Sequence, residues 1–305
     1  MKINPISYVL PEDDPLDIRK DLVFKAVFTK NTPESTGALS NLVSALIGRK
    51  VSVVSILANE PPPQDIRDRQ IRYDINCKVE NGELINVEMT FEPAKYEPVR
   101  LEFHIAKLYI GQNIKGTDKT FDDLQQAYQI SILAEERVFK DDEAFFHSFE
   151  YYDPVNKVSL NGRTQIITLE LRKLDGIVEK PADEMSVSER WAVYFEYLTD
   201  REKRGKINEI LEREEGIAMA SEVLMTISRD DEERARIYRD EKIILDYQSG
   251  LVHAKREAKR EGAEEEREKN YKEKLDNARS ALSEGIPVET VQRIFGLDLE
   301  TIKAL

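Results

Sequence analysis

Two acidic residues, Asp74 and Glu88, lie in the middle of two short segments that have the pattern of neighbouring β-strands. Residues 71–79 and 84–91 alternate between apolar and polar side chains, which is typical of half-buried strands. The turn sequence Asn81-Gly82 separates them. Each acid lies on the polar face of its segment. Because carboxylate oxygens suit Mg²⁺ or Mn²⁺, the pair predicts a divalent cation site that can activate water for phosphodiester hydrolysis.

The strand register decides whether the two acids meet, since a slip of one residue moves every side chain to the other face. A two-residue turn at Asn81-Gly82 pairs Asp74 with Met89, which contradicts the alternation. A three-residue loop, Glu80-Asn81-Gly82 with the glycine in the left-handed conformation, pairs Asp74 with Glu88. We predict this bulged hairpin. Opposed carboxylates repel each other, and a cation would remove that penalty.

The second segment is expected to bury its apolar residues and to expose Asn86, Glu88 and Thr90. Thirteen residues separate Asp74 from Glu88, and Thr90 follows two positions after Glu88. This spacing is by itself a moderate signal of a metal site. Solvated polar residues on an ordinary hairpin therefore stay an alternative at this point. The helices and strands around the hairpin must position any other functional side chains beside it.

Helical and strand patterns alternate through the first 180 residues. Apolar residues recur at helical spacing between residues 17 and 47, with a break at Pro33 and an end at Gly48. Together these patterns predict an α/β sandwich. The other expected elements are a strand at 51–57, a helix at about 97–114, and strands at 128–133 and 166–171.

Beyond about residue 180 the chain is rich in charged residues that favour helices. Ser186 and Glu189 form a capping-box pattern ahead of an apolar stripe that begins at Trp191. Residues 253–274 are nearly all Ala, Lys, Arg and Glu, and they lack an apolar heptad seam, which predicts a solvated helix. We expect three sections: a mixed α/β domain over 1–180, a helical extension over 181–252, and a charged helix with a small helical motif over 253–305.

The last thirty residues predict three short helices. Gly285 and Gly296 fit positions just after a helix, Pro287 a first helical position and Asp298 an N-cap. The trio resembles a helix-turn-helix. A small bundle that contacts a partner protein is the alternative, because no recognition helix is basic.

The net charge of −14 limits how the chain can engage nucleic acid. Residues 1–180 hold 23 Lys and Arg against 29 Asp and Glu, and residues 181–305 hold 22 against 30, so neither part is basic. Binding to DNA would need a local patch and metal ions, with a modest affinity that is sensitive to salt.

The composition also argues against disulfides, cysteine-based zinc sites and membrane spans. Cys77 is the single cysteine and the three histidines are scattered, so an intrachain disulfide and a cysteine-based zinc site are excluded. No stretch of about eighteen apolar residues predicts a membrane span, and the first residues lack the apolar core of a signal peptide. We therefore expect a cytoplasmic protein.

Several motifs in order make the sequence similar to a known family. They begin with residues 21–28, Asp-Leu-Val-Phe-Lys-Ala-Val-Phe, and continue with Asp74, with Asn81-Gly82 and with residues 86–89. Later anchors are Arg100, residues 107–109, Trp191 with Phe195, and the glycines of the closing helices. Over nearly its whole length the chain resembles the recombination-promoting nucleases, also described as transposases, of the PD-(D/E)XK nuclease superfamily.

The resemblance implies a restriction-endonuclease-like core, a central mixed sheet flanked by helices, followed by an all-α charged region. It also implies metal-dependent endonucleolytic cleavage of DNA. Asp74 and Glu88 would be ligands of Mg²⁺ or Mn²⁺, with the Met89 carbonyl as a third, and Asp21 would add an acid from the first helix. A simple helical pair between Asp21 and Lys25 is the alternative for that residue.

Three residues of one predicted helix could steady phosphates near the metal: Arg100, His104 and Lys107. Solvated helix residues are the alternative for all three. His104 stands where the family leads us to expect an aromatic residue.

One departure from the family pattern concerns Thr90. The residue two positions after the catalytic Glu is usually Lys or Gln, whereas a Thr hydroxyl can orient water but adds no charge. Because this charge is missing, we expect that the cleavage activity is weak, is rescued by Lys107 or Lys78, or is lost. Two hypotheses follow: a Mg²⁺-dependent DNA endonuclease linked to recombination or mobile elements, and a nuclease-fold protein that acts as a DNA- or protein-interaction module and could self-associate through its helical tail.

Overall fold

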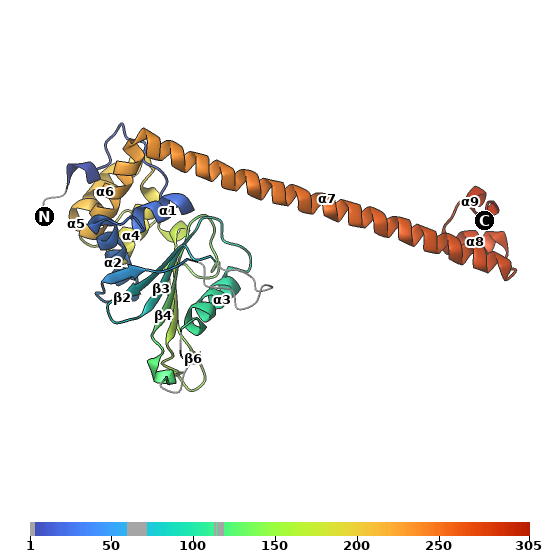
Figure 1. The fold of residues 1–305 in the computed structure, drawn as a ribbon, viewed down its shortest axis with the longest axis horizontal. Coiled ribbons are helices and arrows are strands. Elements are labelled where there is room, and N and C mark those ends of the chain that lie inside the picture. Colours follow the sequence, from blue (N-terminus) through green and yellow to red (C-terminus); the bar gives the residue numbers. More distant parts are fainter. Residues whose placement is uncertain (1–3, 60–71, 113, 115–118) are drawn as a thin grey trace. The chain divides into compact units, whose positions relative to one another are not determined.

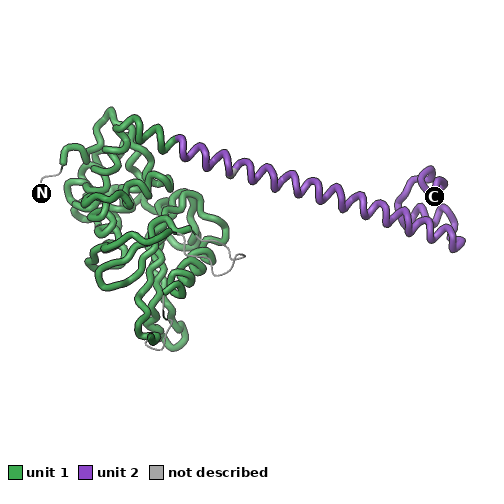
Figure 2. The backbone as a smooth tube through the Cα atoms, in the orientation of Figure 1, with its two compact units in different colours: residues 1–238 green, residues 239–305 purple. Residues whose placement is uncertain are grey.

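The computed structural model describes residues 4–59, 72–112, 114 and 119–305. The chain forms two compact units, Met1–Tyr238 and Arg239–Leu305, which Figure 2 distinguishes by colour. The section boundaries predicted at residues 180 and 252 stay predictions. Within the described residues, no helix combines the length and the apolar character that crossing a bilayer requires.

A six-stranded mixed sheet is the centre of the first unit (Figure 1). Its order is β1-β2-β3-β4-β8-β5, with β3, β4 and β8 parallel and the outer neighbours antiparallel. The strands are β1 (Val53–Ile56), β2 (Ile75–Val79), β3 (Leu84–Thr90), β4 (Ala127–Leu133), β5 (Phe146–Phe149) and β8 (Thr164–Glu170), and β6 (Tyr152–Asp153) and β7 (Val158–Ser159) form a separate small hairpin. The mixed sheet confirms the predicted fold class.

The hairpin of β2 and β3 has the predicted register. Ile75 lies opposite Val87 and Lys78 opposite Leu84, so the same register extended by one residue places Asp74 opposite Glu88. The Gly82 N–H donates to the Val79 carbonyl at 2.9 Å, and Gly82 has a φ of 92°. Only glycine adopts this conformation without strain. The bulged loop is confirmed, while Ile71, expected to begin the first strand, lies outside the described residues.

Helices pack on both faces of the sheet. They are α1 (Asp21–Phe28), α2 (Pro33–Ile47), α3 (Glu97–Ile110), α4 (Val187–Tyr197), α5 (Arg204–Arg213) and α6 (Glu215–Arg229), with short 3₁₀ turns at Pro5–Ser7, Phe121–Asp123, Leu171–Lys173 and Arg201–Lys203. Thr32 caps α2, and the predicted capping box of Ser186 with Glu189 begins α4. Gly48 ends α2 in the left-handed conformation, with φ 76°.

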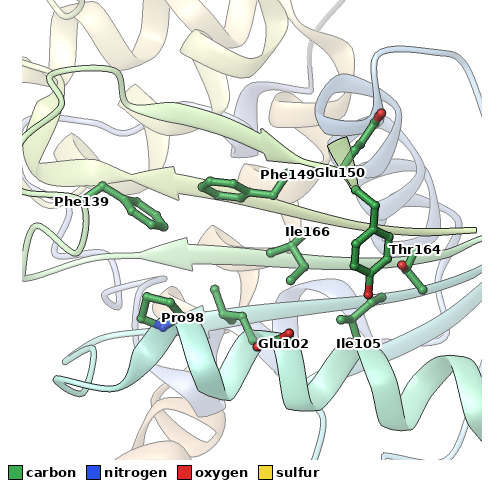
Figure 3. Close-up of a pocket in the computed structure, with 10 residues that line it drawn as sticks. Pro98, Glu102, Ile105, Phe139, Phe149, Glu150, Thr164 and Ile166 are labelled. Atoms are coloured by element: carbon green, nitrogen blue, oxygen red, sulfur yellow. The ribbon is translucent and has the colours of Figure 1, made fainter. Parts of the chain in front are cut away.

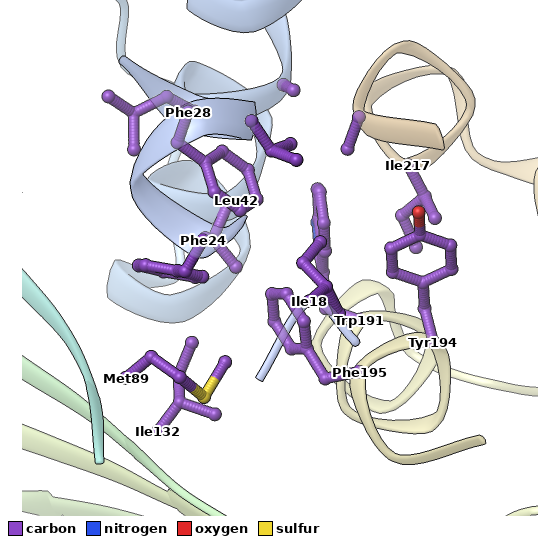
Figure 4. Packing of buried hydrophobic residues seen from close by; sticks show 14 of the residues in the cluster. Ile18, Phe24, Phe28, Leu42, Met89, Ile132, Trp191, Tyr194, Phe195 and Ile217 are labelled. Carbon is purple, nitrogen blue, oxygen red and sulfur yellow. The ribbon is translucent and has the colours of Figure 1, made fainter. Parts of the chain in front are cut away.

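The main core lies between the sheet and the helices α1, α2, α4, α5 and α6. Its centre is aromatic: Phe28 lies 5.8 Å from Trp191, which stacks on Phe195 at 5.3 Å between ring centroids (Figure 4). The Trp191 indole N–H donates to Asn41 Oδ1 at 2.8 Å, so its one polar atom is satisfied inside the core. The helices beyond residue 180 therefore complete the same core as the sheet.

The opposite face of the sheet carries polar residues, and α3 covers it. Asn86 and Glu88 are buried there with Gln129 of β4, although we expected Asn86 and Glu88 to be exposed. That expectation was wrong because it treated the hairpin as an edge with one wet face. The whole of β4 is buried, as is typical of a central strand that is covered on both sides.

The second unit consists of most of α7 (Asp231–Ser283) followed by α8 (Val288–Phe295) and α9 (Leu299–Lys303). The predicted solvated helix is confirmed, since residues 253–274 of α7 are almost entirely exposed. Gly285 and Gly296 have positive φ, and the Asp298 side chain accepts the Thr301 N–H. Pro287 is the N-cap of α8, one position before the predicted one.

Candidate active site

A cavity of about 670 Å³ opens where β2 and β3 lie beside α3. Its lining comes from the Asp74 end of the hairpin, from α3 and from the segment before α3. The residues that line it are Asp21, Arg72, Asp74, Glu88, Met89, Thr90, Phe91, Glu92, Ala94, Tyr96, Glu97, Val99, Arg100, Phe103 and His104. Most of the residues singled out from the sequence therefore meet in one cleft.

Asp74 is held between a helix and the neighbouring strand. Its Oδ1 pairs with Lys25 Nζ at 3.0 Å, and its Oδ2 accepts the Met89 N–H at 3.1 Å. Burial, followed by the nearby charges of Asp21 and Glu88, raises the pKa of Asp74 to about 7, although Lys25 opposes the shift. Burial is the largest cause of this shift, so the cleft disfavours the charged form of Asp74 unless a further cation is bound.

Glu88 has a different environment. The ring Nδ1–H of His104 donates to Glu88 Oε1 at 2.7 Å, Asn86 donates to the same oxygen at 2.9 Å, and Arg100 Nη1 lies 3.1 Å from Oε2. Burial alone would raise the pKa of Glu88, but the hydrogen bond and charge of His104, together with Arg100, hold it below its usual range. Glu88 is thus an ionised carboxylate in a fixed orientation.

Arg100 links three groups of the cleft. Its guanidinium contacts Glu88, donates to Thr90 Oγ1 at 2.9 Å, and donates through Nε to Glu97 Oε1 at 2.9 Å. Glu97 is buried at the start of α3 and sets the direction of the Arg100 side chain. A positive charge therefore contacts Thr90, two positions after Glu88.

The structure places Lys107 and Lys78, two other residues predicted to support catalysis, outside the lining of the cleft. Lys107 does not line the described part of the cleft, and its Nζ lies 5.8 Å from the Phe103 ring centroid. Lys78 is exposed at the turn end of the hairpin. Arg100 and His104, expected to steady phosphates, both contact Glu88, and their role in DNA binding stays a prediction.

Our sequence analysis did not predict that Lys25 contacts Asp74. It pairs with Asp21 at 2.7 Å, as the helical alternative predicted, and at the same time it reaches Asp74 at 3.0 Å. The signal was present, because an i,i+4 pair puts Asp21 and Lys25 on one helix face. What the sequence did not show was that this face packs against the end of β2.

The donor set of the cleft fits a magnesium ion. Mg²⁺ is commonly bound by one or two carboxylates with several waters, and Asp74 and Glu88 supply two. The N–H and C=O of a strand residue point to the same side, so the Met89 carbonyl faces the same end of β2 as the N–H that Asp74 accepts. Glu88 Oε2 is buried, and although no described contact to it has hydrogen-bond geometry, the Arg100 Nη1 lies 3.1 Å away. Within the described residues, no three His, Cys, Asp or Glu side chains form a metal-holding cluster.

Comparison with models of protein families identifies the family to which this chain belongs. The model for the PD-(D/E)XK nuclease family transposase matches residues 18–254. The chain belongs to this family. Searches of curated proteins and of solved structures give no match. Membership in this family of PD-(D/E)XK nucleases supports a nuclease-like function and implies DNA as the substrate. The matched span covers the sheet, the cleft and α1 to α6, and it ends within α7.

Proposed function

We propose that this PD-(D/E)XK protein is a metal-dependent DNA endonuclease that hydrolyses phosphodiester bonds during recombination or the movement of mobile elements. The observation that carries the proposal is the opposition of Asp74 and Glu88 in one cleft, with the Met89 backbone between them. A buried carboxylate, Glu88, facing a half-buried one, Asp74, is costly unless a cation joins them.

The residues around the two carboxylates then have distinct roles in the reaction. Asp74, Glu88 and the Met89 carbonyl would hold Mg²⁺ or Mn²⁺, which when bound supplies an activated water and stabilises charge on the phosphate. His104 and Asn86 orient Glu88 through its Oε1. Lys25 and Arg100 bring positive charge to the two carboxylates, where a phosphate group would otherwise be repelled.

The test is cleavage of supercoiled plasmid by the full-length protein with Mg²⁺ or Mn²⁺. Asp74→Ala and Glu88→Ala should abolish nicking, while Asp122→Ala, which removes an acid whose side chain is fully exposed outside the cleft, should cut like wild type. Intact plasmid at every salt and metal condition, with Asp74→Ala indistinguishable from wild type, would refute the proposal.

A second candidate is a catalytically weak nuclease fold that acts by association. It is favoured by Thr90 and by exposed apolar side chains on α7, which we name the α7 stripe: Ile243, Ile244, Leu245, Tyr247, Leu251 and Val252. Solvated helices seldom expose so many large apolar residues in ten positions. A protein that light scattering shows to be monomeric and that nicks DNA readily would exclude this candidate.

A further inference from the structure

Two lysines rest on aromatic rings that line the cleft. Lys20, the residue before α1, has its Nζ 3.7 Å from the ring centroid of Phe91. Lys107 of α3 has its Nζ 5.8 Å from the ring centroid of Phe103. Phe91 and Phe103 both belong to the cleft lining. A cation within about 6 Å of a ring centroid is attracted to the face of the ring, so the two rings hold both charges beside the cleft.

These two lysines differ from their basic neighbours because no described acid neutralises them. Lys25, Arg100 and His104 each contact at least one carboxylate of the cleft. The guanidinium of Arg19 also lies over the Phe91 ring, but it pairs with three carboxylates. Within the described residues, the two ring-held lysines form no ion pair. Their charges are therefore available to an anion that enters the cleft.

The two lysines lie on opposite sides of Glu88 along the cleft. Lys20 lies at the end of β3, over the residue that follows the strand. Arg100 of α3 donates to the last residue of β3 at 2.9 Å, and His104, one turn further along α3, contacts Glu88. Lys107 comes three residues after His104 on the same helix face, and its rise beyond Arg100 is about 10 Å. Glu88 is therefore between the two positive charges.

A strand of DNA matches this arrangement of charge. Each strand carries one negative charge for about every 3.4 Å of helix axis, so the phosphates on both sides of a phosphate held near Glu88 pass within reach of the two lysines. A lysine ammonium binds phosphate as a flexible point charge. The acids of the cleft oppose this binding only in part, because Glu92 is the one acid of the described lining that contacts no described cation.

The opposite side of α3 offers phosphate no such contact. A second cavity, of about 250 Å³, lies there between α3 and β8, and Ile105 and Ile166 line it (Figure 3). The charged residues of its described lining are the acids Glu102 and Glu150. Carboxylates repel phosphate. A DNA backbone therefore fits the side of α3 that carries Lys107.

We propose that Lys20 and Lys107 each bind a backbone phosphate of the DNA strand in the cleft, one on either side of the phosphate that is cleaved. The inference rests on the proposed nuclease function, and it names the part of the substrate that the rims of the cleft recognise. It also locates the basic contacts that a chain with a net charge of −14 needs in order to hold DNA. Contacts to phosphate add affinity without a preference for base sequence.

The experiment measures fluorescence anisotropy of a labelled duplex of about 20 base pairs with the full-length protein, at NaCl concentrations from about 50 to 200 mM. EDTA is present to prevent cleavage. A lysine that neutralises one phosphate contributes about 0.9 to the slope of log affinity against log salt concentration. Lys20→Met and Lys107→Met should each lower the slope by about that amount and weaken binding roughly tenfold at the lowest salt concentration. The double variant should lose both contributions.

The matched controls are Lys50→Met and Lys140→Met, which remove exposed lysines outside the described lining of the cleft and should keep the wild-type slope. Lys20→Arg and Lys107→Arg retain the charge and should also keep it. Phe103→Leu removes a ring but no charge, so the slope should stay while the affinity falls about threefold.

Three results would overturn the proposal. The first is a wild-type slope in either Lys20→Met or Lys107→Met, because each lysine is assigned its own phosphate. The second is an equal loss of slope in Lys50→Met or Lys140→Met, which would show that the effect comes from the overall charge of the protein. The third is a wild-type protein that binds no duplex even at the lowest salt concentration.

Cleavage of plasmid distinguishes this proposal from the nuclease proposal. With Mg²⁺, Lys20→Met and Lys107→Met should raise KM and keep kcat, because contacts to flanking phosphates are equal in the ground state and the transition state. If Asp74-dependent nicking is present and both variants keep the wild-type slope and KM, the phosphate contacts are refuted and the nuclease proposal stands. If no metal supports nicking but both variants lower the slope, the nuclease proposal fails and the phosphate contacts stand.

Discussion

At the scale of single residues, the cleft treats its two central carboxylates differently. Glu88 is held ionised by His104 and Arg100, whereas burial and the charges of Asp21 and Glu88 raise the pKa of Asp74 to about 7. This asymmetry leaves Asp74 as the group whose charge a bound cation would stabilise. It also makes the stability of the metal-free protein dependent on pH.

We expect Asp74→Asn to stabilise the metal-free protein at pH 8. A carboxyl with a folded-state pKa of about 7 and an ordinary value of 3.8 binds its proton more tightly in the folded state, so stability falls as the pH rises between these two values. The asparagine side chain of the variant carries no such charge, and the gain at pH 8 should be roughly 2 kcal/mol. Thermal unfolding of both proteins from pH 4 to 9 measures the difference. Equal profiles would contradict it.

Thermal unfolding in the presence of Mg²⁺ tests whether Asp74 binds the cation. It should raise the unfolding temperature of wild type at pH 8, because a ligand that binds only the folded state stabilises it. The same Mg²⁺ should have little effect on Asp74→Asn. A matched increase in both proteins would place the cation away from Asp74.

Lys25 should be required for efficient cleavage. It pairs with both Asp21 and Asp74, so Lys25→Met leaves two acids without their cation and should reduce the nicking rate roughly a hundredfold. Because the charge of Lys25 lowers the pKa of Asp74, its loss should also move the pH profile of cleavage upward. Lys25→Arg should keep part of the rate. Lys78→Met, at the far end of the hairpin, is the control.

Thr90→Lys should not raise activity. The Arg100 guanidinium already donates to the Thr90 hydroxyl at 2.9 Å, so a lysine would place a second positive charge against it. A large gain in the nicking rate would show instead that Thr90 is a degraded catalytic position.

At the scale of elements, the bulged hairpin sets the register that brings the acids together, and Gly82 makes the bulge possible. Gly82→Ala should cost about 1–2 kcal/mol of folding free energy, because φ is 92° and the added Cβ would lie 3.3 Å from Gln125 Oε1. Gly205→Ala is the control, since its added Cβ meets nothing within 4 Å and its position is helical. Urea unfolding of the two variants checks the difference.

Much of this element-level arrangement could be read from the sequence. Alternation and turn chemistry are local, so they predicted the register that opposes Asp74 and Glu88. Burial is not local. Asn86 and Glu88 are covered because α3 and β4 pack over them, and no pattern within residues 84–91 carries that information. The short strand β5 was missed for the same reason, since it is defined by its pairing with β8.

The same limit applies to the candidate site. The hairpin acids were found because their spacing is set by one turn. Glu97 and Lys25 act through contacts with other groups of the cleft, Glu97 with Arg100 and Lys25 with Asp74. Their types suggested ordinary helix residues, and only the packing of α1 and α3 against the sheet brings them to the cleft.

At the scale of the whole molecule, the α7 stripe predicts self-association. The following residues, 253–274, hold eight basic and seven acidic side chains, so two copies of this helix can lie together with little net repulsion. Ile244 and Leu251 are 42% and 53% exposed and lie seven residues apart, which places them on one side of the helix. A second copy would cover them.

The full-length protein should therefore be a dimer at micromolar concentration by light scattering. The double variant Ile244→Glu with Leu251→Glu should have the monomer mass of 35.2 kDa, because the two carboxylates, one near each end of the stripe, would be buried without partners. Tyr271→Glu is the control, since it adds a charge at another exposed position of α7 and should leave the dimer intact. If wild type has the monomer mass, the stripe does not pair with itself. If the double variant is monomeric and still nicks plasmid at the wild-type rate, one copy of the cleft is sufficient for the reaction.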